Sequence, residues 1–327
     1  MKSVFTVFLA AFLLFSCGKK GGFIPRNFDA IEIETLVHDS LLNVRTLELD
    51  DERLLGISSV GMQYSLFFDG LNELIETELV RNPESRFRSC AIRNDNFFYL
   101  SIGSPAELYK NGMLVYYEKH PKAFFDSMGF WNDQEGIAIG DSTDGCLSVI
   151  ITRDGGETWT KLSCNELPKG SENEGAFAAS DTNIAIVGNK AWVATTYGRV
   201  YYSPDKGKTW EVFDTPIVKE KDTEGIYSID FYNELNGFAI GGDYTKPNDN
   251  TANKIATSDG GKTWQLVAQN QNPGYRSCVQ YVPNGKAKEL VAVGFKGVDV
   301  SNDAGESWKH LNDEGFYTIR FLNDSVA

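Results

Sequence analysis

The stretch TSDGGKTW, residues 257–264, indicates the fold class because the same pattern occurs four times in the chain. The other copies are TRDGGETW at 152–159, SPDKGKTW at 203–210 and SNDAGESW at 301–308. Successive copies begin 51, 54 and 44 residues apart. A repeat of this length is the sequence signature of a solenoid or a propeller.

Each position of this pattern suits a tight turn between two strands. The Asp side chain accepts hydrogen bonds from backbone N–H groups a few residues further on, and the Gly adopts backbone angles that a Cβ atom resists. The Trp packs its large apolar face between neighbouring repeats. Because no nucleophile stands beside a base, we predict a structural role for Asp154, Trp159, Asp205, Trp210, Asp259, Trp264, Asp303 and Trp308.

A second repeated signal supplies the remaining strands. WNDQEGIAIGD (131–141) and YNELNGFAIGGD (232–243) each read as a polar turn, an alternating apolar strand and a glycine. Combined with the Asp turn, this pattern indicates four antiparallel strands per repeat, which is a propeller blade. We therefore predict an all-β fold, a β-propeller of seven four-stranded antiparallel blades, with six or eight as alternatives. The last blade is expected to be truncated, since residues 315–327 supply only its first strand, and residues 31–37 are expected to add an outer strand to it.

The eight-residue pattern resembles the Asp-box, also called the bacterial neuraminidase repeat. Together with the glycine-ended strands it is similar to the photosystem II assembly-factor-like propellers and to extracellular lipoproteins of Bacteroidetes-type bacteria. The resemblance extends over residues 30–327. It implies a propeller whose Asp-boxes lie away from the ligand-binding face. It implies little about activity, because propellers carry many functions.

The N-terminus reads as a targeting segment. Lys2 precedes a short apolar run at residues 4–15, and LFSC at 14–17 resembles the bacterial lipobox. We predict a signal peptide over 1–16, a lipidated Cys17 with a tether over 17–29, and one propeller domain over 30–327. An ordinary secretory signal is the alternative. The expected location is the cell envelope, outside the cytoplasm, with the N-terminal lipid in the membrane.

The remaining cysteines fall into two pairs. Cys146 and Cys164 lie nearly symmetrically about the turn at Gly155, so we predict a disulfide between them in an oxidising compartment. Cys90 and Cys278 each end an RSC triplet, which places them at equivalent positions in two repeats. Equivalent positions in a ring are usually too far apart to bond.

The loops that lead into the innermost strands form the face where propellers bind ligands. When these strands are aligned, Arg occupies one position in three blades, Asp occupies it in a fourth, and a Glu-Gly pair precedes three others. The residues are Arg45, Arg88, Arg276, Asp126, Glu174, Glu224 and Glu314. We interpret this ring chiefly as ion pairs between adjacent blades, and we keep its members as ligand-binding candidates.

A sialidase-like site is the competing interpretation of the same ring. Sialidases use three arginines for a carboxylate, an Asp as general acid and a Tyr–Glu pair as nucleophile, so Asp126, Glu224 and Tyr227 are the catalytic candidates. The Arg-Ile-Pro motif that opens such enzymes is missing. The sequence favours a non-enzymatic scaffold for a protein or glycan partner, with a glycoside hydrolase acting on an anionic sugar as the alternative.

Composition excludes other classes. A formal charge of −14 disfavours nucleic acid, and the scattered histidines disfavour zinc. Asp141 and Asp243 are weak candidates for calcium, and no cofactor is otherwise expected. A peripheral redox protein would need a bound cofactor, for which no binding motif is present.

Overall fold

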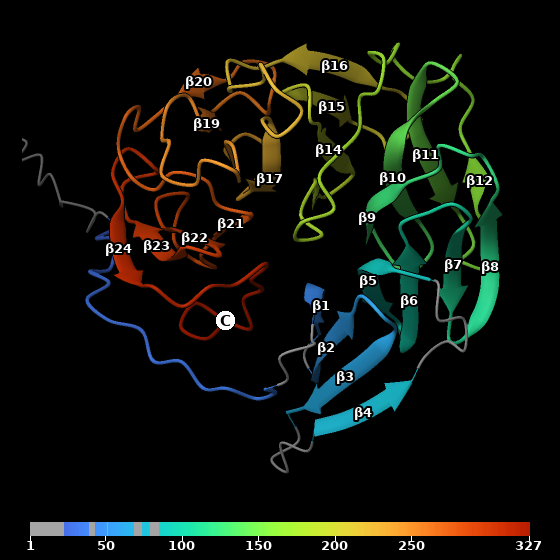
Figure 1. Ribbon diagram of the computed structural model, residues 1–327, viewed down its shortest axis with the longest axis horizontal. Coiled ribbons are helices and arrows are strands. Elements are labelled where there is room, and N and C mark those ends of the chain that lie inside the picture. Colours follow the sequence, from blue (N-terminus) through green and yellow to red (C-terminus); the bar gives the residue numbers. More distant parts are fainter. Residues whose placement is uncertain (1–22, 39–42, 51, 69–73, 79–84) are drawn as a thin grey trace, which may run out of the picture.

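The computed structural model describes residues 23–38, 43–50, 52–68, 74–78 and 85–327, and within these ranges every regular element is a β-strand. The strands form six antiparallel sheets of four strands each, and Figure 1 shows them arranged in a ring around a common centre. The prediction of an all-β propeller with four-stranded blades is therefore confirmed.

Each blade is formed from consecutive strands, and the first strand of each blade lies innermost. Blade 1 contains β1 (Val44–Leu49), β2 (Arg53–Ser58), β3 (Met62–Phe67) and β4 (Leu74–Glu78); blade 2 contains β5 (Phe87–Arg93), β6 (Asn96–Ser101), β7 (Ala106–Lys110) and β8 (Met113–Glu118); blade 3 contains β9 (Phe125–Phe130), β10 (Gly136–Thr143), β11 (Cys146–Thr152) and β12 (Thr160–Lys161). Blade 4 contains β13 (Ile184–Val187), β14 (Lys190–Ala194), β15 (Arg199–Ser203) and β16 (Glu211–Asp214); blade 5 contains β17 (Ile226–Phe231), β18 (Gly237–Gly241), β19 (Lys254–Thr257) and β20 (Gln265–Leu266); blade 6 contains β21 (Cys278–Tyr281), β22 (Leu290–Gly294), β23 (Gly297–Ser301) and β24 (Lys309–Asn312).

The core lies between blades because both faces of each sheet are apolar. On β10, Ile137 and Ile139 pack with Val193 of blade 4, whereas Ala138 packs with Phe98 of blade 2. Successive side chains of a strand point to opposite faces, so one alternating run fills two interfaces. The strands that end in glycine in the sequence pattern are second strands of their blades, β10 in blade 3 and β18 in blade 5.

The prediction of seven blades is wrong, because the structure has six. Residues 315–327 form no strand, and Figure 1 shows this end of the chain alone between blade 6 and blade 1. Residues 31–37 form no strand either. A single extended segment with no strand paired to it among the described residues is not a sheet, so these residues form no seventh blade.

The Asp turn of blade 5 is held by side-chain hydrogen bonds. Thr257 Oγ1 donates to Asp259 Oδ1 (2.8 Å) and accepts from Gly261 N (3.1 Å). Asp259 also accepts from Thr263 N (3.0 Å) and Thr263 Oγ1 (2.7 Å), while Trp264 Nε1 donates to Gly261 O (3.0 Å). The turn is therefore a closed polar unit that places the Trp ring on the core.

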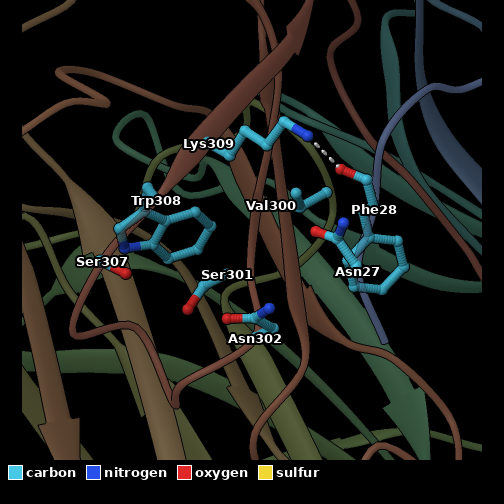
Figure 2. Close-up of a pocket in the computed structure, with 8 residues that line it drawn as sticks. All are labelled: Asn27, Phe28, Val300, Ser301, Asn302, Ser307, Trp308 and Lys309. Atoms are coloured by element: carbon cyan, nitrogen blue, oxygen red, sulfur yellow. Dashed lines mark hydrogen bonds between the residues drawn. The ribbon is translucent and has the colours of Figure 1, made fainter. Parts of the chain in front are cut away.

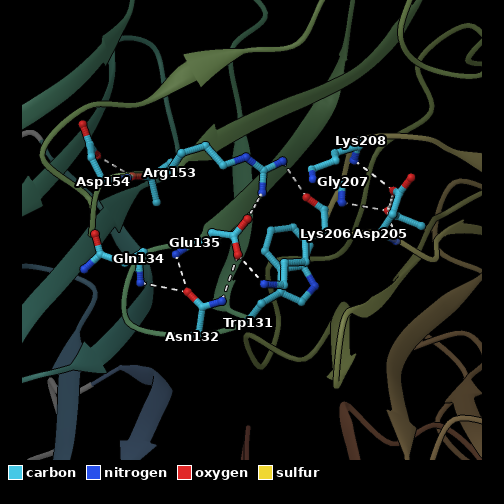
Figure 3. A network of polar contacts seen from close by, with 12 residues as sticks. Trp131, Asn132, Gln134, Glu135, Arg153, Asp154, Asp205, Lys206, Gly207 and Lys208 are labelled. Atoms are coloured by element: carbon cyan, nitrogen blue, oxygen red, sulfur yellow. Dashed lines mark hydrogen bonds and ion pairs between the residues drawn. The ribbon is translucent and has the colours of Figure 1, made fainter.

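The turns built on Asp154, Asp205 and Asp303 repeat these bonds. Trp159 departs from the pattern, because its indole N–H has no partner among the described residues. Its ring instead meets Phe130 edge-on at 5.9 Å. Figure 3 shows that the turns of blades 3 and 4 are also joined: Glu135 accepts from Arg153 (2.9 Å) and pairs with Lys206.

We expect Asp259→Ala to lower the free energy of unfolding by about 2 kcal/mol, because it leaves backbone and hydroxyl donors of the turn without an acceptor. Urea denaturation followed by tryptophan fluorescence measures the change. The matched control is Ser258→Ala at the exposed neighbouring position, which we expect to change stability by no more than about 0.5 kcal/mol. Equal losses in the two variants would contradict a special role for the Asp.

Candidate functional site

The loops that lead into the innermost strands lie at one end of the ring of blades, which we call the loop face. Arg45, Arg88, Asp126 and Tyr227 are each the second residue of β1, β5, β9 and β17, respectively. Arg276 lies two residues before β21. The alignment of the repeats made from the sequence therefore agrees with the strand starts in the structure at four of these five positions.

Arg45 and Arg88 form a cationic pair on the loop face. The Arg45 guanidinium lies 4.2 Å from the centre of the Tyr317 ring, and its Nε donates to Asn43 Oδ1 (2.9 Å). Arg88 donates to the carbonyl of Phe87 (3.3 Å). Burial and the neighbouring charge of Arg45 lower the pKa of Arg88 to about 10. Neither guanidinium has a carboxylate partner among the described residues, although the chain carries a net charge of −14.

Arg276 is bound within its own blade. Its Nε donates to Asp299 Oδ2 (2.7 Å) and its Nη1 to the carbonyl of Tyr275 (2.7 Å). Asp299 Oδ1 is also 3.1 Å from His310 Nδ1. Arg276 and Asp299 are both buried, at 5% and 1% exposed. The charge of Arg276 is therefore already compensated, unlike the charges of Arg45 and Arg88.

The three glutamates of the predicted ring have separate surroundings. Glu174 is buried and accepts from Arg199 Nε (2.9 Å) and Thr195 Oγ1 (2.8 Å). Glu224 accepts from Lys221 Nζ (2.7 Å), three residues away. Glu314 is exposed.

The sequence predicts that these residues form ion pairs between adjacent blades. They do not, because the ion pairs of Glu174 and Arg276 each lie within one blade. Glu174 and Arg276 both precede an innermost strand, and both reach the third strand of their own sheet, through Arg199 on β15 and Asp299 on β23. Ion pairs between blades do occur outside this set of residues, as between Glu135 and Lys206. Among the innermost strands, polar contacts between blades come from hydroxyl groups. Ser228 Oγ, for example, accepts from Val279 N (2.9 Å).

Asp126 lies beneath the loop face. It is 0% exposed, and neither carboxylate oxygen has a hydrogen-bond partner among the described residues. Burial, together with the charge of Asp141, raises the pKa of Asp126 well above its usual range, and the nearby backbone N–H of Ala176, which is not in hydrogen-bonding geometry, offsets only part of that rise. Burial also raises the pKa of Asp141 to about 6, and Asp141 Oδ1 accepts from Ala176 N (3.2 Å). The loop that carries Ala176 thus packs against Asp141, which stays half-buried.

Tyr227 is equally enclosed. Its hydroxyl donates to the carbonyl of Thr223 (2.9 Å), and its ring stacks on Phe177 with centroids 3.7 Å apart. Tyr227 is only 3% exposed. The three catalytic candidates thus have distinct environments: Asp126 is buried without a partner, Glu224 is bound to Lys221, and Tyr227 is bound to its own loop.

An aromatic group that we did not predict extends from this stack across the loop face. Tyr227 meets Tyr275 edge-on at 4.7 Å, and Tyr275 lies 5.5 Å from Phe295. Phe295 and Tyr317 are 45% and 39% exposed. The sequence does carry a signal for this group, because Phe177, Tyr227 and Tyr317 each stand two residues after the glycine of a Glu-Gly pair.

The cysteines have the following places. Cys146 and Cys164 are joined by a disulfide with their Cα atoms 5.4 Å apart. Cys90 and Cys278 are free and buried, and Cys90 Sγ is 2.9 Å from Thr46 Oγ1. The predicted signal peptide and lipidated Cys17 lie outside the described residues.

The calcium candidates each have one carboxylate oxygen bound by protein donors, whereas Asp243 Oδ2 has no hydrogen-bond partner among the described residues and lies 3.7 Å from Lys221 Nζ. Asp243 Oδ1 accepts from Thr245 N (2.9 Å) and Thr245 Oγ1 (2.6 Å), and Asp141 accepts from Ala176. Within the described ranges, no group of three or more His, Cys, Asp or Glu side chains is arranged to hold a metal ion.

Two small hollows lie away from the arginine pair. The first, of about 110 Å³, separates Phe28 of the N-terminal segment from Trp308 of the fourth Asp turn; Figure 2 shows Lys309 reaching the Phe28 carbonyl across it. The second, of about 280 Å³, is lined by Lys122, Asp144 and residues 169–173.

In the part of the chain that the structure describes, no helix is long and apolar enough to cross a membrane.

Comparison with known proteins supports the fold. The family model described as Sortilin-Vps10 (sortilin, neurotensin receptor 3) matches residues 147–289, from β11 in blade 3 to the loop before β22 in blade 6. No curated protein sequence matches the chain.

Solved propeller structures superpose on most of its length. A structure described as YCF48 bound to D1 peptide has a TM-score of 0.63 at 13% identity, covering 90% of this chain and 92% of that one. The RRP9 WD40 repeats give 0.61 at 12% identity, covering 88% and 86%. The Neurospora crassa Pan2 WD40 domain gives 0.58 at 12% identity, covering 87% and 84%. Identities this low establish a propeller fold and no more.

Proposed function

We propose that this chain is a non-enzymatic scaffold that binds an acidic segment of a protein partner on its loop face. The observation that carries the proposal is the pair of guanidinium groups at Arg45 and Arg88, which have no carboxylate partner among the described residues and lie beside the exposed ring of Tyr317. Guanidinium groups recognise carboxylates through charge-assisted hydrogen bonds. Because the chain carries a net charge of −14, a cationic pair that it leaves without a carboxylate partner among the described residues supports a negatively charged ligand.

The aromatic residues of the loop face favour a polypeptide as the ligand. Rings such as Phe295 and Tyr317 offer a large rigid contact area at a low entropic cost, which is why aromatic residues are enriched at protein interfaces. The YCF48 structure of similar fold contains a bound peptide. A role in assembling or stabilising an envelope complex is consistent with both observations. A glycan ligand is the other possible outcome of the binding test.

The proposal includes attachment to the cell envelope through lipid on Cys17. It rests on the lipobox-like LFSC pattern, and the Cys146–Cys164 disulfide suits an oxidising compartment. We expect Cys17→Ala to move the expressed protein from the membrane fraction to the soluble fraction. Membrane fractionation with immunodetection measures this, and a variant that stays in the membrane fraction would contradict the proposed anchor.

A sialidase-like hydrolase is less well supported by these surroundings. Arg276 is occupied by Asp299, and Asp126 is fully buried, so neither group is free to act on a sugar. Release of fluorophore from a 4-methylumbelliferyl sialoside by the purified protein, with loss of that release in Glu224→Gln, would overturn the scaffold proposal in favour of this one.

The binding proposal is tested with a fluorescent oligoglutamate peptide and its oligoglutamine counterpart. We expect Arg45→Gln combined with Arg88→Gln to weaken oligoglutamate binding at least about 100-fold, since each of the two charge-assisted contacts contributes about 1.5–3 kcal/mol and 1.4 kcal/mol corresponds to about tenfold. Fluorescence anisotropy at low and at physiological salt measures the affinity.

The matched control for this test is Arg153→Gln. Arg153 is an exposed arginine in the Asp turn of blade 3, where it pairs with Glu135 (Figure 3). Equal weakening by the control variant, or equal binding of the two peptides, would contradict recognition by the arginine pair.

A further inference from the structure

The loop face divides into a cationic part and an aromatic part. The cationic part is the pair formed by Arg45 and Arg88, on the innermost strands of blades 1 and 2. The aromatic part, which we call the aromatic patch, lies in blades 5 and 6 and consists of Tyr227, Tyr244, Tyr275 and Phe295. Both parts therefore lie at the same end of the ring of blades.

The aromatic patch has a buried base and exposed outer rings. Tyr227 and Tyr275 form the base, where they are 3% and 5% exposed and their ring centroids lie 4.7 Å apart. The rings of Tyr244 and Phe295 lie 6.4 Å and 5.5 Å from that of Tyr275, and these two residues are 48% and 45% exposed. Exposed rings that pack on a buried base form a preorganised apolar surface, which loses little freedom when it binds a ligand.

Tyr317 connects the aromatic patch to the arginine pair. Ser277 Oγ donates to Tyr317 O (2.7 Å), and Phe316 N donates to Gly294 O (3.1 Å), so this segment is held to the parts of blade 6 that carry the patch. On its other side, the Tyr317 ring lies 4.2 Å from the guanidinium of Arg45. The aromatic patch and the arginine pair are therefore parts of one continuous surface.

The aromatic patch offers ring surface in place of charge. Arg276, which follows Tyr275 in the chain, does not add to the charge of the arginine pair, because its Nε donates to Asp299 Oδ2 (2.7 Å). The hydroxyl of Tyr227 is occupied as well, since it donates to the carbonyl of Thr223 (2.9 Å). A neutral surface of exposed aromatic rings binds apolar and aromatic side chains, which bury apolar area and pack against the ring edges.

We propose that the loop face binds a two-part polypeptide segment, in which acidic residues contact the arginine pair and a stretch of aromatic and proline residues close by in the same chain contacts the aromatic patch. This inference rests on the proposed function, because it keeps the acidic part of the ligand on Arg45 and Arg88. Proline-rich stretches dock on aromatic surfaces with little loss of entropy, since their extended conformation is already formed. A polypeptide can place carboxylates and apolar side chains a few residues apart, which matches the continuous surface.

The test compares the binding of four fluorescent peptides to the purified protein by anisotropy. The first is an oligoglutamate run, the second adds Trp-Pro-Trp after a Gly-Ser spacer, and the third adds Ser-Pro-Ser in its place. The fourth carries Trp-Pro-Trp after an oligoglutamine run. We expect the second peptide to bind at least about tenfold more tightly than the third, since only its Trp rings can pack on the aromatic patch.

The variant that tests the aromatic patch is Tyr244→Ala combined with Phe295→Ala, which removes the two exposed rings and leaves the arginine pair intact. We expect this variant to bind the second and third peptides within about twofold of each other and to bind oligoglutamate as the parent does. The matched control is Tyr117→Ala, at an exposed tyrosine on the outer strand β8 of blade 2, which should keep the full difference between the two peptides. Arg45→Gln combined with Arg88→Gln is expected to weaken all three glutamate peptides.

Photo-cross-linking locates the apolar part of the ligand. With benzoylphenylalanine in place of the first Trp, we expect the second peptide to attach to residues 242–249 or 294–297, as identified by mass spectrometry. If oligoglutamate binds but Trp-Pro-Trp adds nothing, or if the cross-links fall elsewhere, this inference is overturned and the proposed function stands. Equal binding of the second and fourth peptides, or no binding of any peptide, would overturn both. Displacement of the second peptide by oligoalginate at a lower concentration than by oligoglutamate would replace the polypeptide with an acidic glycan.

Discussion

At about pH 6, Asp126→Asn is expected to unfold with a free energy about 2–3 kcal/mol higher than the parent protein, whereas at about pH 4 the two proteins are expected to be alike. Asp126 is 0% exposed, and neither carboxylate oxygen has a partner among the described residues. Burial and the charge of Asp141 raise its pKa, so the folded protein holds this proton more tightly than the unfolded chain does. Stability is therefore lost as pH rises.

The size of this effect follows from proton linkage. Above the unfolded-state pKa of about 4, each pH unit costs about 1.4 kcal/mol for as long as the buried carboxyl stays protonated. Asparagine has the shape of the protonated acid and does not titrate, so the difference between the proteins grows with pH. Asp141, with a pKa of about 6, remains in both proteins.

Urea denaturation at the two pH values measures the difference, and Asp133→Asn is the matched control. Asp133 is an exposed carboxyl in the β9–β10 turn of the same blade. We expect this control to show no growth of the difference with pH. A constant difference for Asp126→Asn, or a decrease at the higher pH, would mean that Asp126 is ionised and compensated in the folded protein.

Much of the fold was predictable because its determinants are local in sequence. The turn of residues 257–264 closes through its own Thr, Asp and Gly, so the pattern identifies the turn without reference to the rest of the chain. The alternation of GIAIG at 136–140 identifies β10 in the same way. A repeat of such units has few solutions other than a propeller.

The number of blades depends on a feature that the repeats do not carry. Residues 315–321 resemble the start of a blade, and they do lie beside the innermost strand of blade 6. A blade also needs partner strands, and the described residues offer none beside residues 315–321. Counting innermost strands therefore gave seven positions, of which six are blades.

The candidate site was predictable in residue type but not in pairing. Aligning the strand starts placed Arg45, Arg88 and Arg276 at similar positions, yet among the described residues only Arg276 has an acidic partner. That partner, Asp299, lies on the third strand of the blade, and its proximity depends on how β21, β22 and β23 are registered. The distinction between a structural arginine and a ligand-binding one is therefore tertiary information.

The same distinction gives the second large prediction, which is that Arg276→Met lowers the free energy of unfolding by about 3–5 kcal/mol. Met preserves much of the apolar stem but leaves the Asp299 carboxylate, which is 1% exposed, without the guanidinium that binds it at 2.7 Å. Removing one partner of a buried ion pair costs more than the pair contributes, because the remaining charge stays desolvated. Chemical denaturation measures the loss.

The double variant Arg276→Met with Asp299→Asn separates this cause from lost packing. Without the buried charge, we expect most of the stability to return, even though the Arg is still absent. The paired comparison is Arg45→Gln, which removes a guanidinium that has no carboxylate partner among the described residues and should change stability by no more than about 0.5 kcal/mol. If Arg45→Gln destabilised the protein as strongly as Arg276→Met, Arg45 would also be structural, and the loop face would lose its basis for recognising an acidic ligand.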